Sequence, residues 1–338
     1  MPQLGLEIAG RQIGPGNPPY VIAEIGINHG GSADVAREMI SVAAATGVDA
    51  VKLQTFKTGC FLSRKSAYFD VLAAAELSPK DLKALSEHAA TLGVTLFSAV
   101  FDEPSADVWN DLNAAAFKIA SGDITHLPLL RHVAALDRPV ILSSGGATMI
   151  EIARGLGEMR AVSPALPVAV LHCVSHYPTQ PKEANLACMA AIRAAFDCPV
   201  GFSDHTLGTA TAVAAVALGA NIIEKHFTLD RAAEGPDHAL SADPDDMKRL
   251  VADVMVAWES IGKNKKAPVE SADHVMQIRR SLVAERPIKK GEVVTRTMLG
   301  VKRPGTGVQS ADIANVIGKR AAADIDADDV ITWDLLEE

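Results

Sequence analysis

Short runs of apolar and β-branched residues recur along this chain, separated by segments with helical periodicity. The predicted strands are residues 20–26, 49–56, 94–101, 115–121, 139–145, 168–174, 199–204 and 221–227. Two intervening segments, 32–47 and 78–93, open on Ser and close on Gly, which are the usual start and stop signals of helices. Eight such units over about 260 residues predict an α/β fold, a (β/α)₈ TIM barrel. An open doubly wound sheet is disfavoured because no GxGxxG follows the first strand.

The pattern changes after residue 262. Residues 263–277 are polar and predict a linker, so the barrel is expected to occupy residues 1–262. Residues 278–338 predict a small second domain, with short strands, frequent Gly and Pro, and one brief helical segment. A domain of about 60 residues is marginal on its own, so we expect it to dock on the barrel or on another subunit.

Charge and cysteine usage exclude several classes of protein. The net charge of −9 argues against binding to nucleic acid or to an anionic membrane surface. We find no apolar leader and no apolar run of about 20 residues, and therefore expect neither a signal peptide nor a membrane span. The 4 cysteines form no CxxC pair, which is typical of a reducing compartment. These features predict a cytoplasmic protein.

Polar residues stand at or just after the ends of the predicted strands. They are Glu24, Lys52, Gln54, Ser98, Lys118, Ser121, Ser143, Ser144, His172, Tyr177, Ser203, Asp204, His205, Glu224, Lys225 and His226. The carboxyl ends of the strands of such a barrel converge on one mouth, where catalysis takes place. Three lysines from three strands would then face a single cavity, which predicts a polyanionic ligand because buried lysines lose their charge unless it is compensated. The alternative is that each lysine pairs with a carboxylate such as Glu24 or Glu224.

His205 and His226 end neighbouring strands, so their imidazoles could meet at metal-ligand distance. With Asp204, Glu224 and Asp237 nearby in the sequence, a divalent site for Mn²⁺, Zn²⁺ or Fe²⁺ is one of two readings that remain open. The other is that both are satisfied core or surface histidines. Four further histidines are expected in loops or on helix surfaces, namely His29, His88, His126 and His132. The role of His238, which follows the eighth strand closely, stays open.

Several motifs carry a family resemblance, in order along almost the whole chain. "IAEIGINHGGS", "DAVKLQTF", "FKIASGDITHLPLL", "YPTQPKEANL", "GFSDHTLG" and "EKHFTLDRAAEGPDHALS" resemble the N-acetylneuraminate (sialic acid) synthases and their legionaminate and pseudaminate relatives. The tail, with "IKKGEVVT" and "VKRPGTG", resembles the antifreeze-like (SAF) domain that these enzymes carry. The resemblance implies an enzyme that condenses phosphoenolpyruvate with an N-acetylhexosamine-type aldose to give a nonulosonic 2-keto acid and phosphate.

The resemblance also implies roles for individual residues. Phosphoenolpyruvate would be held by Lys52, Gln54, Lys118, Ser121, Ser143 and Ser203. The catalytic set would be Glu24, Lys52, Glu224 and Lys225, with His205 and His226 holding a divalent metal, Mn²⁺ first and Mg²⁺ or Co²⁺ as alternatives. The sugar would contact Gln54, Asp123, Tyr177, Asp237 and Arg303. Arg303 would act across a domain-swapped homodimer.

Departures from the family pattern fall on the sugar side. The segment between "KLQTF" and residue 78 is short, and Asp123 stands where sialate synthases have Glu. Ala99-Val100 replaces Thr-Pro, and Ser175 replaces an asparagine of some members. The acceptor therefore stays open between N-acetylmannosamine, a diacetamido-hexose and an unrelated aldose. A catalytically silent sugar- or phosphate-binding scaffold and an ice-binding module are the alternatives from other classes.

Overall fold

The chain folds as two compact units, Met1–Gly262 and Lys263–Glu338, in a computed structural model that describes residues 5–262 and 266–338. Each unit has its own apolar core. The predicted linker, 263–277, is described only from residue 266, and a short helix, α11 (Ala272–Ile278), occupies its second half.

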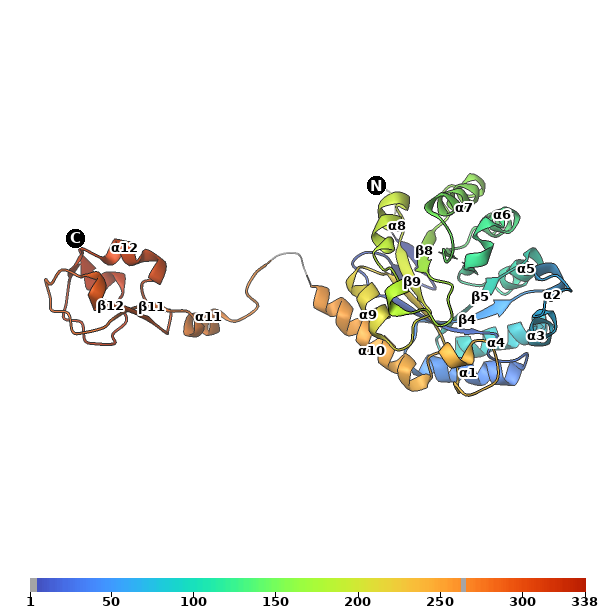
Figure 1. Ribbon diagram of the computed structural model, residues 1–338, viewed down its shortest axis with the longest axis horizontal. Helices are drawn as coiled ribbons and strands as arrows, with labels where there is room; N and C mark the ends of the chain where they lie inside the picture. The colour runs from blue at the N-terminus through green and yellow to red at the C-terminus, as the bar shows by residue number, and fades with distance from the viewer. Residues whose placement is uncertain (1–4, 263–265) are drawn as a thin grey trace. The chain divides into compact units, whose positions relative to one another are not determined.

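The first unit is a closed barrel of eight parallel strands, as the sequence predicts (Figure 1). The barrel strands are β3 (Tyr20–Gly26), β4 (Ala50–Thr55), β5 (Thr95–Val100), β6 (Phe117–Ile119), β7 (Val140–Ser143), β8 (Val168–Cys173), β9 (Val200–Asp204) and β10 (Ile222–His226). Each strand pairs with its neighbour in the chain, and β10 pairs with β3 to close the ring.

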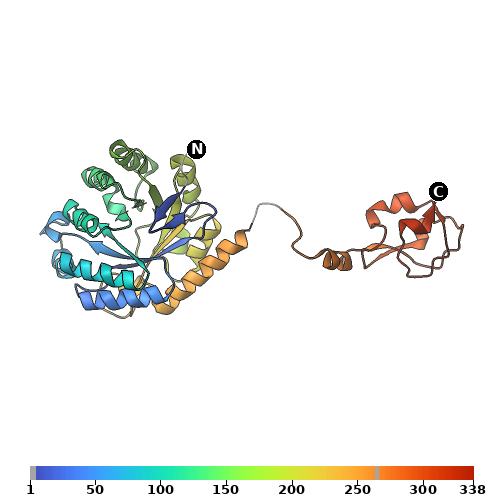
Figure 2. The ribbon, with the colours of Figure 1, turned by 180° about the vertical axis from the view of Figure 1, so that it is seen from behind.

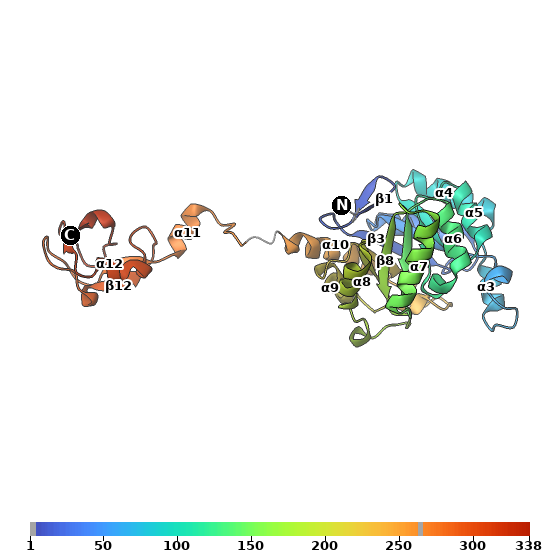
Figure 3. The ribbon, with the colours of Figure 1, turned by 90° about the horizontal axis from the view of Figure 1, so that it is seen from above.

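Helices surround the strands and cover their outer face (Figures 1 and 3). They are α1 (Ala33–Ala45), α4 (Pro79–Thr91), α5 (Glu103–Asp111), α6 (Leu127–Ala135), α7 (Met149–Val162), α8 (Cys188–Phe196), α9 (Ala210–Ala217) and α10 (Pro244–Ile261). Two short helices, α2 (Thr58–Phe61) and α3 (Phe69–Ala75), fill the segment after β4. The predicted start signals are confirmed, because the side chains of Ser32 and Ser78 accept hydrogen bonds from the backbone amides of Val35 and Asp81.

A hairpin of β1 (Leu6–Ile8) and β2 (Arg11–Ile13) lies across one end of the barrel, and is seen from that side in Figure 2. Leu6, Ile8 and Ile13 pack on the inward-facing side chains at the amino ends of the barrel strands. This end of the barrel interior is therefore filled by side chains, and any cavity must lie toward the carboxyl ends of the strands.

The second unit is small and built from short elements, as the sequence predicts. They are β11 (Ser281–Ala284), β12 (Leu299–Lys302), α12 (Ile313–Val316), β13 (Arg320–Ala321) and β14 (Leu336–Glu337), with single 3₁₀ turns η4 (Arg296–Met298), η5 (Ser310–Asp312) and η6 (Trp333–Leu335) between them. Its core contains apolar side chains such as Leu282, Val294 and Ile331. Among the described residues, no helix of either unit is both long and apolar enough to cross a membrane.

Candidate active site

The positions of the site residues follow from the alternation of side chains along each strand. Successive side chains of a strand point to opposite faces, so residues two apart share a face. One layer of inward-facing residues fills the lower barrel, and it includes Ile22, Ala50, Phe97, Ala116, Ile141, Leu171 and Ile222. Two residues further along these strands come Glu24, Lys52, Ala99, Lys118, Ser143, Cys173 and Glu224. Most of these strands thus change from apolar to polar side chains at this step, whereas β5 keeps the apolar Ala99.

These polar residues line a cavity of about 220 Å³ at the carboxyl ends of the strands. Its lining is Glu24, Lys52, Gln54, Ala99, Phe101, Lys118, Ala120, Ser121, Gly122, Ser143, Cys173, Ser175, Tyr177, Ser203, His205, Glu224 and His226. Eleven of these are among the polar residues singled out in the sequence, and they come from seven different strands and the segments that follow them. The structure therefore brings most of the predicted site together.

Two lysines and two glutamates form a buried cluster at the bottom of the cavity. Lys52 Nζ lies 2.5 Å from Glu24 Oε2 and 3.6 Å from Glu224 Oε2. Lys118 Nζ lies 3.6 Å from Glu224 Oε1 and donates a long hydrogen bond to the carbonyl of Ile119. Both readings of the lysines are thus partly right, because they face one cavity and they pair with its carboxylates. Lys118, whose contact with Glu224 is longer than that of Lys52 with Glu24, keeps donors for a ligand.

Burial and the neighbouring charges shift the pKa values of this cluster in opposite directions. Burial raises the pKa of Glu24 to about 7, although Lys52 opposes the shift. Burial also works against ionisation of Glu224, but the ammonium groups of Lys118 and Lys52 outweigh it and hold its pKa at about 2. Burial lowers the pKa of Lys118. Two carboxylates with such different pKa values in one cavity are suited to different roles in a reaction.

Hydroxyl groups surround the lysines. Ser203 Oγ donates to Glu224 Oε1 over 2.9 Å, and Ser121 Oγ accepts from the backbone amide of Gly145 over 2.9 Å. Because Ser121 accepts in this bond, its hydrogen is free to point at a ligand. Ser143 Oγ is buried and has no hydrogen-bond partner among the described residues. Such a group is costly unless a bound molecule satisfies it.

The two predicted metal ligands lie side by side at the mouth of the cavity. The ring centroids of His205 and His226 are 5.4 Å apart. His205 Nδ1 bonds to the carbonyl of Val174 at 2.7 Å, which leaves Nε2 available for a ligand. Burial holds the pKa of His226 well below its usual value, so the ring is neutral, and its Nδ1 is buried without a hydrogen bond. Neutral imidazoles are metal ligands.

The histidine pair fits a metal ion that takes its other ligands from substrate and water. Within the described residues, no three His, Cys, Asp or Glu side chains gather in a geometry that would hold a metal alone. Asp237 Oδ2 lies 3.7 Å from His226 Nδ1. Two imidazole nitrogens, completed by oxygen ligands from substrate or water, are compatible with Mn²⁺, Zn²⁺ or Fe²⁺.

Lys225 does not face the cavity, and its predicted place in the catalytic site is wrong. It follows Glu224 and precedes His226, both of which point inward, so its own side chain points into the helix layer. There Lys225 Nζ lies 2.9 Å from Asp204 Oδ2, and both side chains are almost fully buried. The same alternation turns away four other strand-end residues that were expected at the mouth: Ser98, Ser144, His172 and Asp204.

The predicted sugar-binding residues are placed in four different ways. Gln54 and Tyr177 line the cavity, and the Tyr177 ring lies tilted against the His205 ring with centroids 4.2 Å apart. Asp237 lies beside His226. Asp123 is half-buried in the 3₁₀ turn η1 (Ser121–Thr125) and is absent from the cavity lining, and burial raises its pKa to about 6. Arg303 belongs to the second unit, where it is exposed.

Six lining residues were not predicted as site residues: Ala99, Phe101, Ala120, Gly122, Cys173 and Ser175. Cys173 and Ser175 follow Leu171 at steps of two, and Phe101 follows Phe97 in the same way, so the alternation alone could have found them. The atoms of Cys173 and Ser175 approach the bare face of Gly145 so closely that an added Cβ there would lie 2.4 Å from Ser175 Oγ. A side chain at residue 145 would therefore displace these groups from their places around the cavity.

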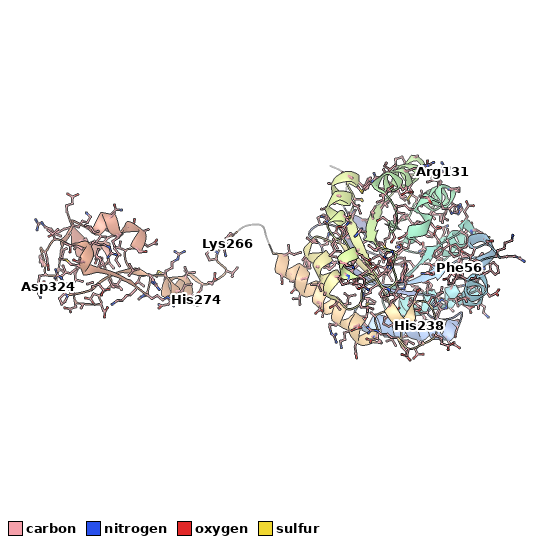
Figure 4. The ribbon with its side chains drawn as sticks, viewed as in Figure 1. Phe56, Arg131, His238, Lys266, His274 and Asp324 are labelled. Carbon is pink, nitrogen blue, oxygen red and sulfur yellow. The ribbon has the colours of Figure 1, made fainter. Side chains whose placement is uncertain are left out.

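A larger hollow, of about 480 Å³, lies outside the barrel mouth between α1, α3 and the segment after β10. Its walls are mainly apolar, and it lacks the lysines and serines of the smaller cavity. His29 and His238 line it, and both are buried. His29 lies in the turn after β3, so its predicted loop position is confirmed. Each is held locally, since His29 Nδ1 accepts from the amide of Gly31 and His238 Nδ1 bonds to Thr228 Oγ1. Figure 4 labels His238 on the barrel unit, together with Phe56, which follows β4.

The chain is similar to known proteins over most of its length. The chain is 40% identical over 330 residues to an uncharacterized protein of Methanocaldococcus jannaschii, covering 97% of this chain and 98% of that one. It is 35% identical to an N,N'-diacetyllegionaminic acid synthase of Legionella pneumophila, covering 94% of both chains. The crystal structure of an N-acetylneuraminic acid synthetase from Leptospira borgpetersenii in complex with citrate matches with a TM-score of 0.76 and 32% identity, over 80% of this chain and 93% of that one.

Two family models also match. The SAF domain model matches residues 279–337, which is almost the whole of the second compact unit. The NeuB family model matches residues 39–266, a range that contains most of the cavity lining. Since this range is more than half of the chain, the protein belongs to the NeuB family.

Proposed function

We propose that this protein condenses phosphoenolpyruvate with an N-acetylhexosamine-type aldose, giving a nonulosonic 2-keto acid and inorganic phosphate. The observation that carries the proposal is the buried cluster of Lys52, Lys118, Glu24 and Glu224 beneath the His205–His226 pair. The names of the relatives, a diacetyllegionaminic acid synthase and an N-acetylneuraminic acid synthetase, support this reaction class.

Phosphoenolpyruvate supplies the negative charge that the cavity requires. Lys118 has donors to spare, and the hydroxyls of Ser121 and Ser143 are free to donate. Hydrogen bonds between charged groups are stronger than neutral ones, so phosphate and carboxylate oxygens would be favoured here over neutral ligands. Ser203 of β9 and Lys52 of β4 would complete the anion site. Gln54, two residues beyond Lys52 on β4, would contact the substrate from the side of the cavity mouth.

The reaction forms a carbon–carbon bond and a bond between C2 and the oxygen of water, and it breaks the bond between C2 and the phosphate oxygen. The C3 carbon of phosphoenolpyruvate attacks the aldehyde carbon of the open-chain sugar, and the aldehyde oxygen takes up a proton. Water adds to C2, and the tetrahedral intermediate expels phosphate to leave the 2-keto acid. Glu24, whose carboxylate forms as the pH rises through about 7, is placed to orient this water and accept its proton.

A divalent metal, Mn²⁺ first, would be held by His205 and His226. When bound, it would act as a Lewis acid on the aldehyde oxygen, where negative charge develops. His205 is oriented for this role by its bond to the carbonyl of Val174, and the adjacent Tyr177 ring limits its rotation. Mg²⁺ and Co²⁺ are the alternatives for the same site.

The acceptor would lie over the metal, against Gln54, Tyr177 and Asp237, with Asp123 at the edge of the site. Arg303 would reach this site from the second unit of a partner, in a domain-swapped homodimer. We expect a cytoplasmic enzyme. The acceptor is N-acetylmannosamine or a diacetamido-hexose, and the similarity to a diacetyllegionaminic acid synthase favours testing the second first.

The test is phosphate release from phosphoenolpyruvate with Mn²⁺ across a panel of aldoses, with and without EDTA. The panel would hold N-acetylmannosamine, its 6-phosphate and diacetamido-trideoxyhexoses. Release that depends on one aldose and stops with EDTA is the expected result. Binding of phosphoenolpyruvate without release would contradict the acceptor class, whereas no binding at all would favour a silent scaffold. A Lys118→Met variant is the control, because it should lose binding of phosphoenolpyruvate while the fold is kept.

A further inference from the structure

The strongest unexplained feature of the barrel is a buried ionic network directly behind the two histidines. Asp204, Thr206 and Lys225 are 1%, 0% and 3% exposed, and none of them lines the cavity. We call these three side chains the Asp204 clamp. They immediately flank both histidines in the chain, since Asp204 and Thr206 stand on either side of His205 and Lys225 precedes His226.

The hydrogen bonds of the clamp join the two segments that carry the histidines. Lys225 Nζ donates to Asp204 Oδ2 over 2.9 Å and to the backbone carbonyl of Thr206 over 2.6 Å. Asp204 Oδ1 in turn accepts from the backbone amide of Thr206 over 2.9 Å and from its hydroxyl over 2.7 Å. The residues before and after His205 are therefore tied to each other and to the residue before His226.

This arrangement fixes the backbone from which each imidazole projects. An aspartate that accepts from the amide two residues further on closes a local turn, and here His205 is the residue within that turn. Strand β9 ends at Asp204, so the inter-strand ladder does not hold His205. Its backbone carbonyl accepts from the amide of Thr179 over 2.9 Å, and the clamp fixes the residues on either side of it. Beyond the clamp, the His205 ring is positioned by its bond to the carbonyl of Val174 and by contact with Tyr177.

Stability alone does not account for a buried ion pair at this place. Replacing such a pair by apolar residues of similar volume is often neutral or stabilising, because two charges must be desolvated on folding. The surrounding layer is apolar and would accept such residues, as its members Phe202 and Ile223 from the same strands show. What an apolar pair could not do is bond to both the amide and the carbonyl of Thr206.

We propose that Asp204, Thr206 and Lys225 are positioning residues, which set the separation and orientation of the His205 and His226 imidazoles for metal binding. This inference rests on the proposed metal site. Groups behind a metal's ligands typically change metal affinity about 10- to 100-fold when they are removed, and the same range is expected here.

The experiment measures Co²⁺ binding to the full-length protein by calorimetry and by visible absorption, which reports the geometry of the ligands. The variant D204N/K225M is uncharged, so no unpaired charge is buried, and it loses the bonds of the ammonium group. We expect Co²⁺ to bind about 10- to 100-fold more weakly, with a changed absorption spectrum. We also expect kcat to fall while the KM for phosphoenolpyruvate stays close to that of the wild type.

Thr206→Val provides a second variant that removes only one hydroxyl and should fold in any case; a smaller loss of Co²⁺ affinity in the same direction is expected. Met189→Ala, at a buried residue of α8, controls for loss of stability without loss of the clamp. Folded clamp variants with wild-type Co²⁺ affinity and spectrum would overturn the positioning role and leave the proposed function standing. Failure of the wild-type protein itself to bind Co²⁺ would overturn the metal site and this inference together. An equal loss of Co²⁺ affinity in Met189→Ala would show that the effect of the clamp variants comes from lower stability, and would overturn the positioning role.

Discussion

At the scale of single residues, the cavity places ionisable groups of the same type in contrasting surroundings. Glu24 and Glu224 belong to neighbouring strands, β3 and β10, and both are buried. Glu224 faces both lysines and accepts from Ser203, so it stays ionised. Glu24 has one close lysine and also lies in the field of Glu224, which adds to the effect of burial. One carboxylate is thus a fixed charge, while the other can exchange a proton near neutral pH.

The raised pKa of Glu24 gives a pH dependence with a definite sign. A carboxyl group with a pKa of about 7 is protonated below that pH, so a role as a base is lost as the pH falls through about 7. We expect kcat/KM for phosphoenolpyruvate to decrease on the acid side with this apparent pKa. The measurement is a pH profile of phosphate release for the wild type and Glu24→Gln. Glu24→Gln should be slow, and its kcat/KM should not decrease on the acid side. If the same acid-side decrease remains in Glu24→Gln, the titrating group is a residue other than Glu24.

The sequence predicts which residue types line the cavity better than it predicts the face of the strand to which each side chain points. Glu24, Lys118 and His226 were predicted from their place at strand ends, and they line the cavity. The prediction for Lys225 is wrong because it rests on the polarity of the residue alone, whereas the alternation of side chains along β10 turns Lys225 away from the cavity. The neighbouring apolar residues carry that information, since Ile222 packs in the barrel interior and Ile223 in the helix layer. By contrast, the pKa of Glu24 depends on distances between strands far apart in the sequence, and no pattern in the chain specifies those.

At the scale of elements, barrel closure depends on a close approach between β8, β9 and β10. Gly201 lies in β9, between Leu171 of β8 and Ile222 of β10. A Cβ at residue 201 would lie 2.5 Å from the carbonyl oxygen of Ile222 and 2.6 Å from Leu171 Cδ2. These contacts are shorter than real side chains make, and the Ile222 oxygen belongs to the backbone, so it cannot turn aside.

Gly201→Ala should therefore destabilise the barrel, by about 1–3 kcal/mol as is usual for overpacking. Chemical denaturation of the variant and the wild type would measure the change in the free energy of unfolding. Gly157→Ala in α7 is the matched control, because an added Cβ there meets nothing within 4 Å and Ala favours helix over Gly. It should be neutral or stabilising. Equal stability of both variants would show that β9 can shift to accommodate the methyl group.

At the scale of the whole molecule, the chain consists of two units with separate cores, joined through residues that the sequence predicts as a linker. Their sizes are unequal, and the cavity is formed by the larger unit alone. The sequence predicted this division, because the strand–helix alternation stops near residue 262. The relation between the units depends on contacts between surfaces, which carry no periodic signal, so Arg303 stays a predicted partner residue.

Mixing two inactive variants would test whether Arg303 acts across a dimer. Glu24→Gln disables the barrel of one chain, and Arg303→Ala disables the second unit of another. If Arg303 acts on its partner's barrel, each mixed dimer has one intact site, and random exchange restores about a quarter of wild-type activity. Measuring phosphate release before and after co-refolding checks this. Two variants that stay inactive after mixing would place Arg303 on its own chain's barrel or outside the site.

The filled amino end of the barrel has a consequence for the order of events in catalysis. The β1–β2 hairpin and the apolar layer beneath Lys52 and Lys118 leave the described barrel interior approachable only through its carboxyl mouth. Lys52 and Lys118 lie two residues beyond that layer along their strands, and Gln54 and His226 lie four residues beyond it. Phosphoenolpyruvate bound at the depth of the lysines would then be covered by the aldose, which would bind nearer the mouth. Binding should be compulsory-ordered, so that an unreactive aldose analogue inhibits uncompetitively against phosphoenolpyruvate.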